Sequence, residues 1–216
     1  MPVSAYVQSA IFLVLAALAL FASAGTLAIL GFWLYLAILA AIIVASLLAL
    51  DPGLLRERMR PGGQRPPLAL RLFTTVMFLH WIVAGLDRGR FHWSDGVPSW
   101  IQALGLIALT AGYVLCFWAM AVNRSPRSCA SSPTADVVAS GPYAYVRHPG
   151  YLASIVIMLA SGLALGSWLA ALLVIASSLP FLLYRAISED RVLQMELPGY
   201  ADYARRVRWR LVPGIW

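Results

Sequence analysis

Long apolar runs with few or no charged residues dominate the pattern along this chain, and short polar segments separate them. A helix that crosses the hydrocarbon core of a bilayer needs about 20 mostly apolar residues. The pattern therefore predicts an all-α integral membrane protein. The apolar runs cover these stretches: Ser4–Ala24, Leu27–Leu50, Ala69–Leu86, Trp100–Val122 and Tyr151–Tyr184.

The last apolar run is too long for one ordinary span. It has 34 residues, from Tyr151 to Tyr184. One helix of that length would measure about 50 Å, against a hydrocarbon core of about 30 Å. Because Gly162 and Gly166 interrupt the run, we expect a tight hairpin of two helices with its turn near Ser161–Ser167. The prediction is thus about six transmembrane helices, the last two forming the hairpin.

The placement of arginine predicts the orientation. With about six spans, the N-terminus, the loops Asp51–Leu68 and Asn123–His148 and the C-terminal tail share one side. The other side holds only Arg88 and Arg90. Since cytoplasmic loops carry the excess of basic residues, we expect the arginine-rich side of a multi-pass protein, in a bacterial inner membrane, to face the cytoplasm. That side holds Arg56, Arg58, Arg60, Arg65, Arg71, Arg124, Arg127, Arg147, Arg185, Arg191, Arg205, Arg206, Arg208 and Arg210.

Composition excludes several classes of protein. The chain is 61% hydrophobic and 12% charged, which excludes a soluble globule. Its sixteen basic residues are all arginine and are spread between apolar runs, so membrane lipids are expected partners and nucleic acid is not. Cys116 and Cys129 lack the spacing of a disulfide framework or a metal site. His80, inside the third run, is interpreted as a packed core residue.

The loop before the last apolar run ends in a motif, SGPYAYVRHPGY, over Ser140–Tyr151. Gly141 and Pro142 mark a turn, and Pro149 suits the first turn of a helix. The N–H groups at this helix start would attract an anion such as a carboxylate, and His148 could add a hydrogen bond. The alternative is a membrane-interface belt, because Tyr and Arg are common at the end of any span.

Charged residues follow the last apolar run. Arg185 and Glu189 are four apart and share a helix face, which indicates either a surface ion pair or part of a site for a polar ligand. Beyond them, Gly199–Arg210 predicts a short amphipathic C-terminal helix on the membrane surface. Val207, Trp209 and Leu211 would dip into the membrane while the arginines meet the headgroups.

Taken together, the segment from about Thr134 to Trp216 resembles the isoprenylcysteine carboxyl methyltransferase family and its relatives among membrane phospholipid methyltransferases. The resemblance lies in a Gly-x-Tyr-x-x-x-Arg-His-Pro-x-Tyr run, two helices, an acidic pair, a Tyr-x-x-Tyr pair and an Arg-Leu-x-Pro ending. It implies a single transmembrane domain over residues 1–216, with N-terminal helices in 1–122 and a cofactor-binding methyltransferase core in 123–216.

The resemblance also implies a cofactor, S-adenosylmethionine, and a lipophilic small-molecule or lipid substrate. Arg185 takes the place of an arginine that meets the substrate carboxylate, and is the catalytic candidate. Asp190 stands where the family often has a second Glu. The cofactor-binding residues implied are Ala135, Val137, Val138, Tyr143, His148, Pro149, Gly150, Tyr151 and Glu189.

The sequence leaves two chemical classes of methyl acceptor possible, a carboxylate and an amine. A carboxylate acceptor needs no general base, and Arg185 could orient it with two hydrogen bonds. An amine acceptor, as in phospholipid N-methylation, would have to lose a proton, for which Glu189 and His148 are candidates. The presence of Arg185 favours the carboxylate. A small transporter, a structural membrane protein and a nicotinamide-dependent reductase are alternatives of other classes; no phosphate-binding glycine fingerprint supports the last.

Overall fold

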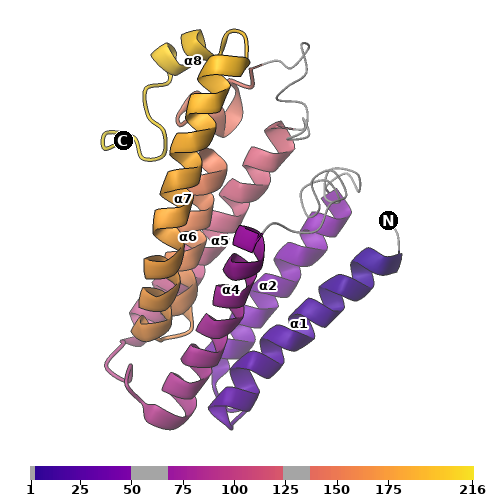
Figure 1. The fold of residues 1–216 in the computed structure, drawn as a ribbon. Coiled ribbons are helices and arrows are strands. Elements are labelled where there is room, and N and C mark those ends of the chain that lie inside the picture. The colour runs from indigo at the N-terminus through magenta and orange to yellow at the C-terminus, as the bar shows by residue number, and fades with distance from the viewer. Residues whose placement is uncertain (1–2, 50–67, 124–136) are drawn as a thin grey trace. The chain divides into compact units, whose positions relative to one another are not determined.

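The computed structural model describes residues 3–49, 68–123 and 137–216. Within these ranges the chain is helical and contains no strand, as Figure 1 shows. The elements are α1 (Val3–Ala24), α2 (Leu30–Ala49), α4 (Leu68–Leu86), the π-helix η2 (Asp87–Phe91), α5 (Ser99–Val122), the 3₁₀ helix η4 (Gly141–Ala144), α6 (Pro149–Ala164), α7 (Trp168–Glu196) and α8 (Tyr200–Arg206).

Among the described residues, four helices are long and apolar enough to cross a membrane: α1 from Tyr6, α2, α5 and α7. This confirms the predicted class of helical membrane protein. α6 is also apolar but has 16 residues. The last apolar run divides into α6 and α7 at residues 165–167, where Gly166 has a positive φ of 73° that glycine adopts without strain. The count of six spans and the membrane hairpin stay predictions.

The described chain forms two compact units. Described residues of the first unit are 3–49, 68–111 and 156–178. Here α1 packs against α2 and α4, and Figure 1 shows these three helices side by side. Small residues permit close packing: a Cβ on Gly85 would collide with the main chain of Leu20, and one on Gly105 with that of Ala164.

A buried polar network joins three helices of this unit. The Nδ1 atom of His80 in α4 lies 2.5 Å from the carbonyl oxygen of Met77, and its Nε2 lies 2.8 Å from the hydroxyl of Ser161 in α6. Tyr35 of α2 contacts the same hydroxyl at 2.9 Å and accepts a bond from the Trp81 indole. Because a carbonyl only accepts, Nδ1 of His80 carries the proton and Ser161 donates to Nε2. This confirms His80 as a packed core residue.

A second buried group lies where η2 meets the turn before α7. Asp87 is fully buried and accepts bonds from the main-chain N–H of Ser94 at 2.8 Å, from the hydroxyl of Ser94 and from the hydroxyl of Ser167 at 2.5 Å. Ser94 in turn accepts a bond from the N–H of Trp168. These bonds satisfy the buried carboxylate and fix the loop after α4 to the start of α7.

Described residues of the second unit are 112–123, 137–155 and 179–216. It holds the end of α5, η4, the start of α6, the second half of α7, and α8 with the segment that follows. α8 is amphipathic: Tyr200 and Tyr203 are buried, whereas Arg205 and Arg206 are exposed. The apolar face of α8 therefore packs on the protein. Leu211, expected at the membrane, is also buried in the protein, because the segment after α8 folds back on the unit.

Candidate active site

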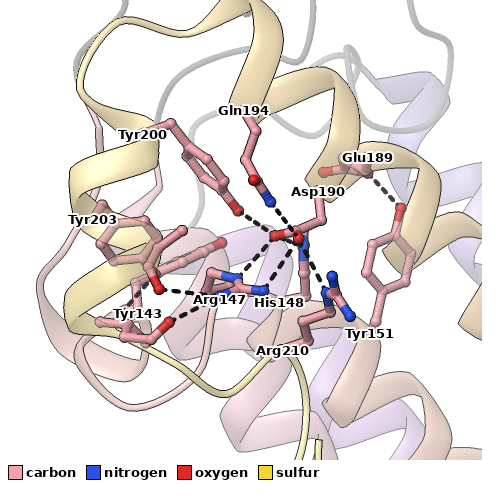
Figure 2. Close-up of polar contacts among 12 residues, drawn as sticks. Tyr143, Arg147, His148, Tyr151, Glu189, Asp190, Gln194, Tyr200, Tyr203 and Arg210 are labelled. Atoms are coloured by element: carbon pink, nitrogen blue, oxygen red, sulfur yellow. Dashed lines mark hydrogen bonds and ion pairs between the residues drawn. The ribbon is translucent and has the colours of Figure 1, made fainter.

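The centre of the second unit is the carboxylate of Asp190 in α7, which is fully buried. Six hydrogen-bond donors point at it, three to each oxygen (Figure 2). We call Asp190 and its partners the Asp190 cluster. Oδ1 accepts from Arg147 Nε at 2.9 Å, Tyr200 at 3.0 Å and His148 Nε2 at 3.3 Å. Oδ2 accepts from Gln194 at 2.9 Å, Arg210 Nε at 3.0 Å and Arg147 Nη2 at 3.1 Å.

This arrangement explains how a carboxylate is tolerated without exposure. An isolated buried carboxylate is strongly destabilising, whereas one with cationic partners and satisfied lone pairs persists. Asp190 has two guanidinium partners, Arg147 and Arg210. Because carboxylate oxygens only accept, His148 carries a proton on Nε2. The Asp190 cluster is thus a closed structural group.

Arg147 ties three segments together. Its forked guanidinium binds Asp190 through two nitrogens, and its Nη1 donates to the carbonyls of Ala204, Val207 and Arg208 at 3.1–3.3 Å. These carbonyls lie at the C-terminal end of α8 and just beyond it, where helix carbonyls lack helical partners and cations are favoured. One buried arginine therefore holds the start of α6, the end of α7 and the end of α8.

The start of α6 is held by the segment after α8. The main-chain N–H of Arg147 donates to the carbonyl of Trp209, and that of His148 to the carbonyl of Arg210, both at 2.9 Å. The carbonyl of His148 then accepts the N–H groups of Tyr151 and Leu152. The sequence pattern predicted an anion site at this helix start; in the structure, the N–H of His148 already has a partner within the protein.

A second group lies beside the Asp190 cluster and is accessible. Tyr151 of α6 donates its hydroxyl to Oε2 of Glu189 at 2.5 Å, as Figure 2 shows. Arg185 lies one turn earlier on α7, with Nη2 at 3.8 Å from the same oxygen. The side chains of Arg185 and Glu189 are 44% and 35% exposed. We call these three residues the open triad.

The two groups share one helix and face different ways. Consecutive residues on an α-helix point about 100° apart. Once Asp190 is anchored in its cluster, Glu189 is directed toward Tyr151 and the surface. The helix rotation that buries one acid therefore exposes the other.

Two tyrosines of α8 complete the surroundings. The hydroxyl of Tyr203 donates to the carbonyl of Tyr143 at 2.7 Å, which fixes α8 to η4. Burial, reinforced by the neighbouring Asp190 carboxylate, raises the pKa of Tyr200 above its ordinary value. The hydroxyl of Tyr200 therefore stays protonated and acts as a donor to Asp190.

The structure brings most of the predicted site residues into this unit. Tyr143 lies in η4, and its hydroxyl accepts a bond from Asn123 at 3.4 Å. Pro149 and Gly150 open α6. Val137 and Val138, which precede η4, are partly exposed; Ala135 lies outside the described residues. The remaining ones are His148 in the Asp190 cluster and Tyr151, Arg185 and Glu189 in the open triad.

Sequence reasoning missed the Asp190 cluster. It treated Asp190 only as the second member of an acidic pair and Arg147 as part of an interface belt, and gave Tyr200 and Arg210 no specific role. The usable signal was the cost of an unpaired Asp at the end of an apolar helix, which requires cationic partners elsewhere in the chain. Which cations those are depends on contacts 43 residues apart, between Arg147 and Asp190, and 20 apart, between Arg210 and Asp190.

Comparisons with known proteins agree with this organisation. Residues 103–195 match the model of the isoprenylcysteine carboxyl methyltransferase (ICMT) family. This segment contains Tyr143, His148 and Tyr151 as well as the charged end of α7. In the part of the chain that the structure describes, no group of three or more His, Cys, Asp or Glu residues is placed to hold a metal ion.

Two curated proteins are similar to this chain. One is the nickel-cobalt-cadmium resistance protein NccN of Alcaligenes xylosoxydans xylosoxydans, 31% identical over 132 residues. The other is the cobalt-zinc-cadmium resistance protein CzcN of Cupriavidus metallidurans, 33% identical over 129 residues. Each match covers 58% of this chain and 56% of the relative, so the chain spans just over half the length of the relatives it matches.

The resemblance predicted from the motifs is thereby confirmed for one continuous segment. The matched segment contains α5 from residue 103 onward, all of α6, and α7 except for its last residue. The four apolar helices of membrane-spanning length agree with the membrane location of such proteins. Residues 103–195 of this chain match the isoprenylcysteine carboxyl methyltransferase family, which supports a membrane methyltransferase.

Proposed function

We propose that this protein is an S-adenosylmethionine-dependent methyltransferase that methylates the carboxylate of an isoprenylcysteine-like, lipophilic acceptor at the cytoplasmic membrane face. The observation that carries the proposal is the open triad inside the segment that matches the family. It joins an accessible cation, Arg185, to an accessible acid, Glu189, at the end of an apolar helix. An acceptor with an apolar chain and an anionic head suits this combination.

The proposed topology has six spans, with α4 and α6 crossing the membrane together with the four longer helices, and α6 and α7 forming the hairpin. The arginine distribution supports a cytoplasmic position for the second unit's polar end. The open triad would then lie at the level of the lipid headgroups. A lipophilic acceptor would reach it from the bilayer without crossing water.

The chemistry of the donor set fits the proposed cofactor. S-adenosylmethionine supplies an electrophilic methyl group on a sulfonium when bound. The half-exposed carboxylate of Glu189 can accept hydrogen bonds from ribose hydroxyls or an ammonium group, and the hydroxyl of Tyr151 holds that carboxylate in place. Val137, Val138 and Tyr143 offer apolar and aromatic surface on the preceding segment. His148, held by Asp190, is assigned to shaping the start of α6.

The chain's contribution to the reaction is orientation. Arg185 presents a planar fork that holds a carboxylate with two parallel hydrogen bonds, which fixes the attacking oxygen. A carboxylate is already ionised at neutral pH, so no residue has to remove a proton.

The test is methyl transfer from radiolabelled S-adenosylmethionine to lipid extracts and to a farnesylated cysteine derivative. Base-labile label that is released as methanol identifies an ester, and base-stable label identifies an N-methyl product. The proposal expects base-labile label on the prenylcysteine. Base-stable label on phospholipid would favour the phospholipid N-methyltransferase alternative, and no label on any acceptor would contradict both.

We further propose that this methyl transfer contributes to tolerance of cobalt and cadmium, because both similar curated proteins are named for resistance to these ions. Cells that lack the protein would be complemented with the wild type or with Arg185→Ala. Higher tolerance only with the wild type is expected. Equal tolerance with both would show that methyl transfer has no part in it.

A further inference from the structure

The segment Val207–Trp216, which we call the C-terminal strap, closes on itself. The N–H groups of Leu211 and Val212 donate to the carbonyl oxygen of Trp216 at 3.0 and 3.1 Å, and the N–H of Trp216 donates back to Val212 at 3.1 Å. The guanidinium of Arg210 lies 5.5 Å from the centre of the Trp216 ring, a cation–π distance. Leu211, within this loop, is buried. The strap is therefore a defined structure.

The strap reaches the candidate site through main-chain bonds. The carbonyls of Trp209 and Arg210 accept the N–H groups of Arg147 and His148, so the strap runs beside the residues that lead into α6. Main-chain bonds of this kind fix backbone position regardless of side chain. The start of α6 is thus attached to a segment about 60 residues later in the chain.

The strap also reaches Asp190 through one side chain. Nε of Arg210 donates to Oδ2 of Asp190 at 3.0 Å, while the main chain of the same residue holds His148. Arg210 therefore contacts α7, the helix that carries Glu189, and His148, the residue just before α6. α6 in turn carries Tyr151 of the open triad. The family match ends at residue 195, so this contact comes from outside the matched segment.

We propose that Arg210 is a positioning residue for the open triad: through Asp190 and His148 it sets the placement of α7 relative to the start of α6, and so the distance between Glu189 and Tyr151. This inference rests on the proposed function for its catalytic consequence. Its structural consequence, that the strap orders the start of α6, is independent of any reaction. The contacts of Arg210 are with Asp190, His148 and Trp216, and we assign it none with acceptor or cofactor.

The test compares Arg210→Ala with Arg208→Ala in the full-length protein in detergent. Both changes remove one arginine from the strap. The side chain of Arg208 is exposed, and its carbonyl, which accepts a bond from Arg147, is kept in the variant. Amide hydrogen exchange over residues 147–152 is the first measurement. Because a charge-assisted bond to a buried acid is lost, exchange there should be about tenfold faster in Arg210→Ala than in Arg208→Ala. Equal exchange in the two variants would overturn the positioning role.

Binding of S-adenosylmethionine and steady-state kinetics form the second measurement. Arg210→Ala should lower kcat and weaken cofactor binding, each about tenfold, and leave KM for the acceptor nearly unchanged, because Arg185 is intact. If exchange is faster in Arg210→Ala but the wild-type protein binds no S-adenosylmethionine, the strap does order the start of α6 and the proposed function is refuted. Faster exchange with unchanged kcat and cofactor affinity would refute the positioning of the triad.

A conservative variant controls for the possibility that Arg210→Ala simply fails to fold. Arg210→Lys keeps the charge and a group that can donate to Asp190, and should recover most of the exchange protection and of kcat. Free guanidinium ion at millimolar concentration should partly restore kcat in Arg210→Ala, since the side chain at this position is 32% exposed. Arg210→Lys that behaves like Arg210→Ala, with no recovery by guanidinium, would contradict the proposal.

Discussion

Arg147 binds Asp190 with two parallel hydrogen bonds, from Nε to Oδ1 at 2.9 Å and from Nη2 to Oδ2 at 3.1 Å. The side chain of Arg147 is 7% exposed and that of Asp190 is fully buried. The pair fixes the second half of α7 to the segment before α6. It is also the reason why a helix with two adjacent acids can direct one of them, Glu189, toward an open surface.

Replacing Asp190 should have a large effect on stability. Asp190→Asn keeps the shape but leaves the guanidinium of Arg147 buried without a counter-charge, so the free energy of unfolding should fall by about 3–5 kcal/mol. Thermal denaturation in detergent, followed by intrinsic fluorescence, measures the change. The control is Asp202→Asn, since Asp202 is exposed and pairs only with Arg205 in the described structure; its effect should not exceed about 1 kcal/mol. Similar losses in both variants would contradict the Asp190 cluster.

Replacing Arg185 distinguishes two roles for this residue, a surface ion pair and a contact with the acceptor. If Arg185 holds the acceptor carboxylate, Arg185→Ala should cost about 2–4 kcal/mol of transition-state stabilisation, roughly 30- to 1000-fold in kcat/KM, with cofactor affinity kept. Arg185→Lys should recover little, because lysine lacks the planar fork. Arg191→Ala, an exposed arginine of α7, is the matched control and should be nearly silent. Near-normal turnover in both Arg185 variants would move the assignment to an amine acceptor.

Cysteine labelling tests the orientation. Ser94 is buried and bonded to Asp87, so the exposed Gly96 is the better reporter for the side that carries Arg88 and Arg90. In a variant without native cysteines, Gly96→Cys should react with a membrane-impermeant maleimide in intact spheroplasts. Ala201→Cys, on the exposed face of α8, should react only after permeabilisation. The reverse pattern would refute the cytoplasmic site.

The His80 network should matter for folding and not for binding. Ser161→Ala removes the donor to His80 and the partner of Tyr35 inside the first unit, and should lower the free energy of unfolding by about 1–3 kcal/mol. Affinity for S-adenosylmethionine should not change. Ser177→Ala is the control and should have little effect, because among the described residues the Ser177 hydroxyl bonds within α7, at 2.6 and 3.2 Å. A selective loss of cofactor affinity in Ser161→Ala would assign this network to the site.

Much of the local chemistry was predictable from the chain by itself. Apolar runs of about 20 residues allow few structures other than membrane helices, so the elements and the break near Gly166 follow from composition and spacing. The motif ending in Pro149-Gly150-Tyr151 and the acid at position 189 also indicated which segments form the candidate site. These features are local, because each depends on residues within one or two helical turns.

Only the tertiary structure decided which charged side chains are buried together. Arg147, Asp190 and Arg210 looked like ordinary residues of a membrane interface, yet they meet in one group because α7, the start of α6 and the strap converge. A buried carboxylate is stable only when its partners arrive from other segments, and sequence spacing does not reveal those partners. For the same reason, the opposite exposures of Asp190 and Glu189, adjacent in sequence, are a property of the packed α7 and not of the residues alone.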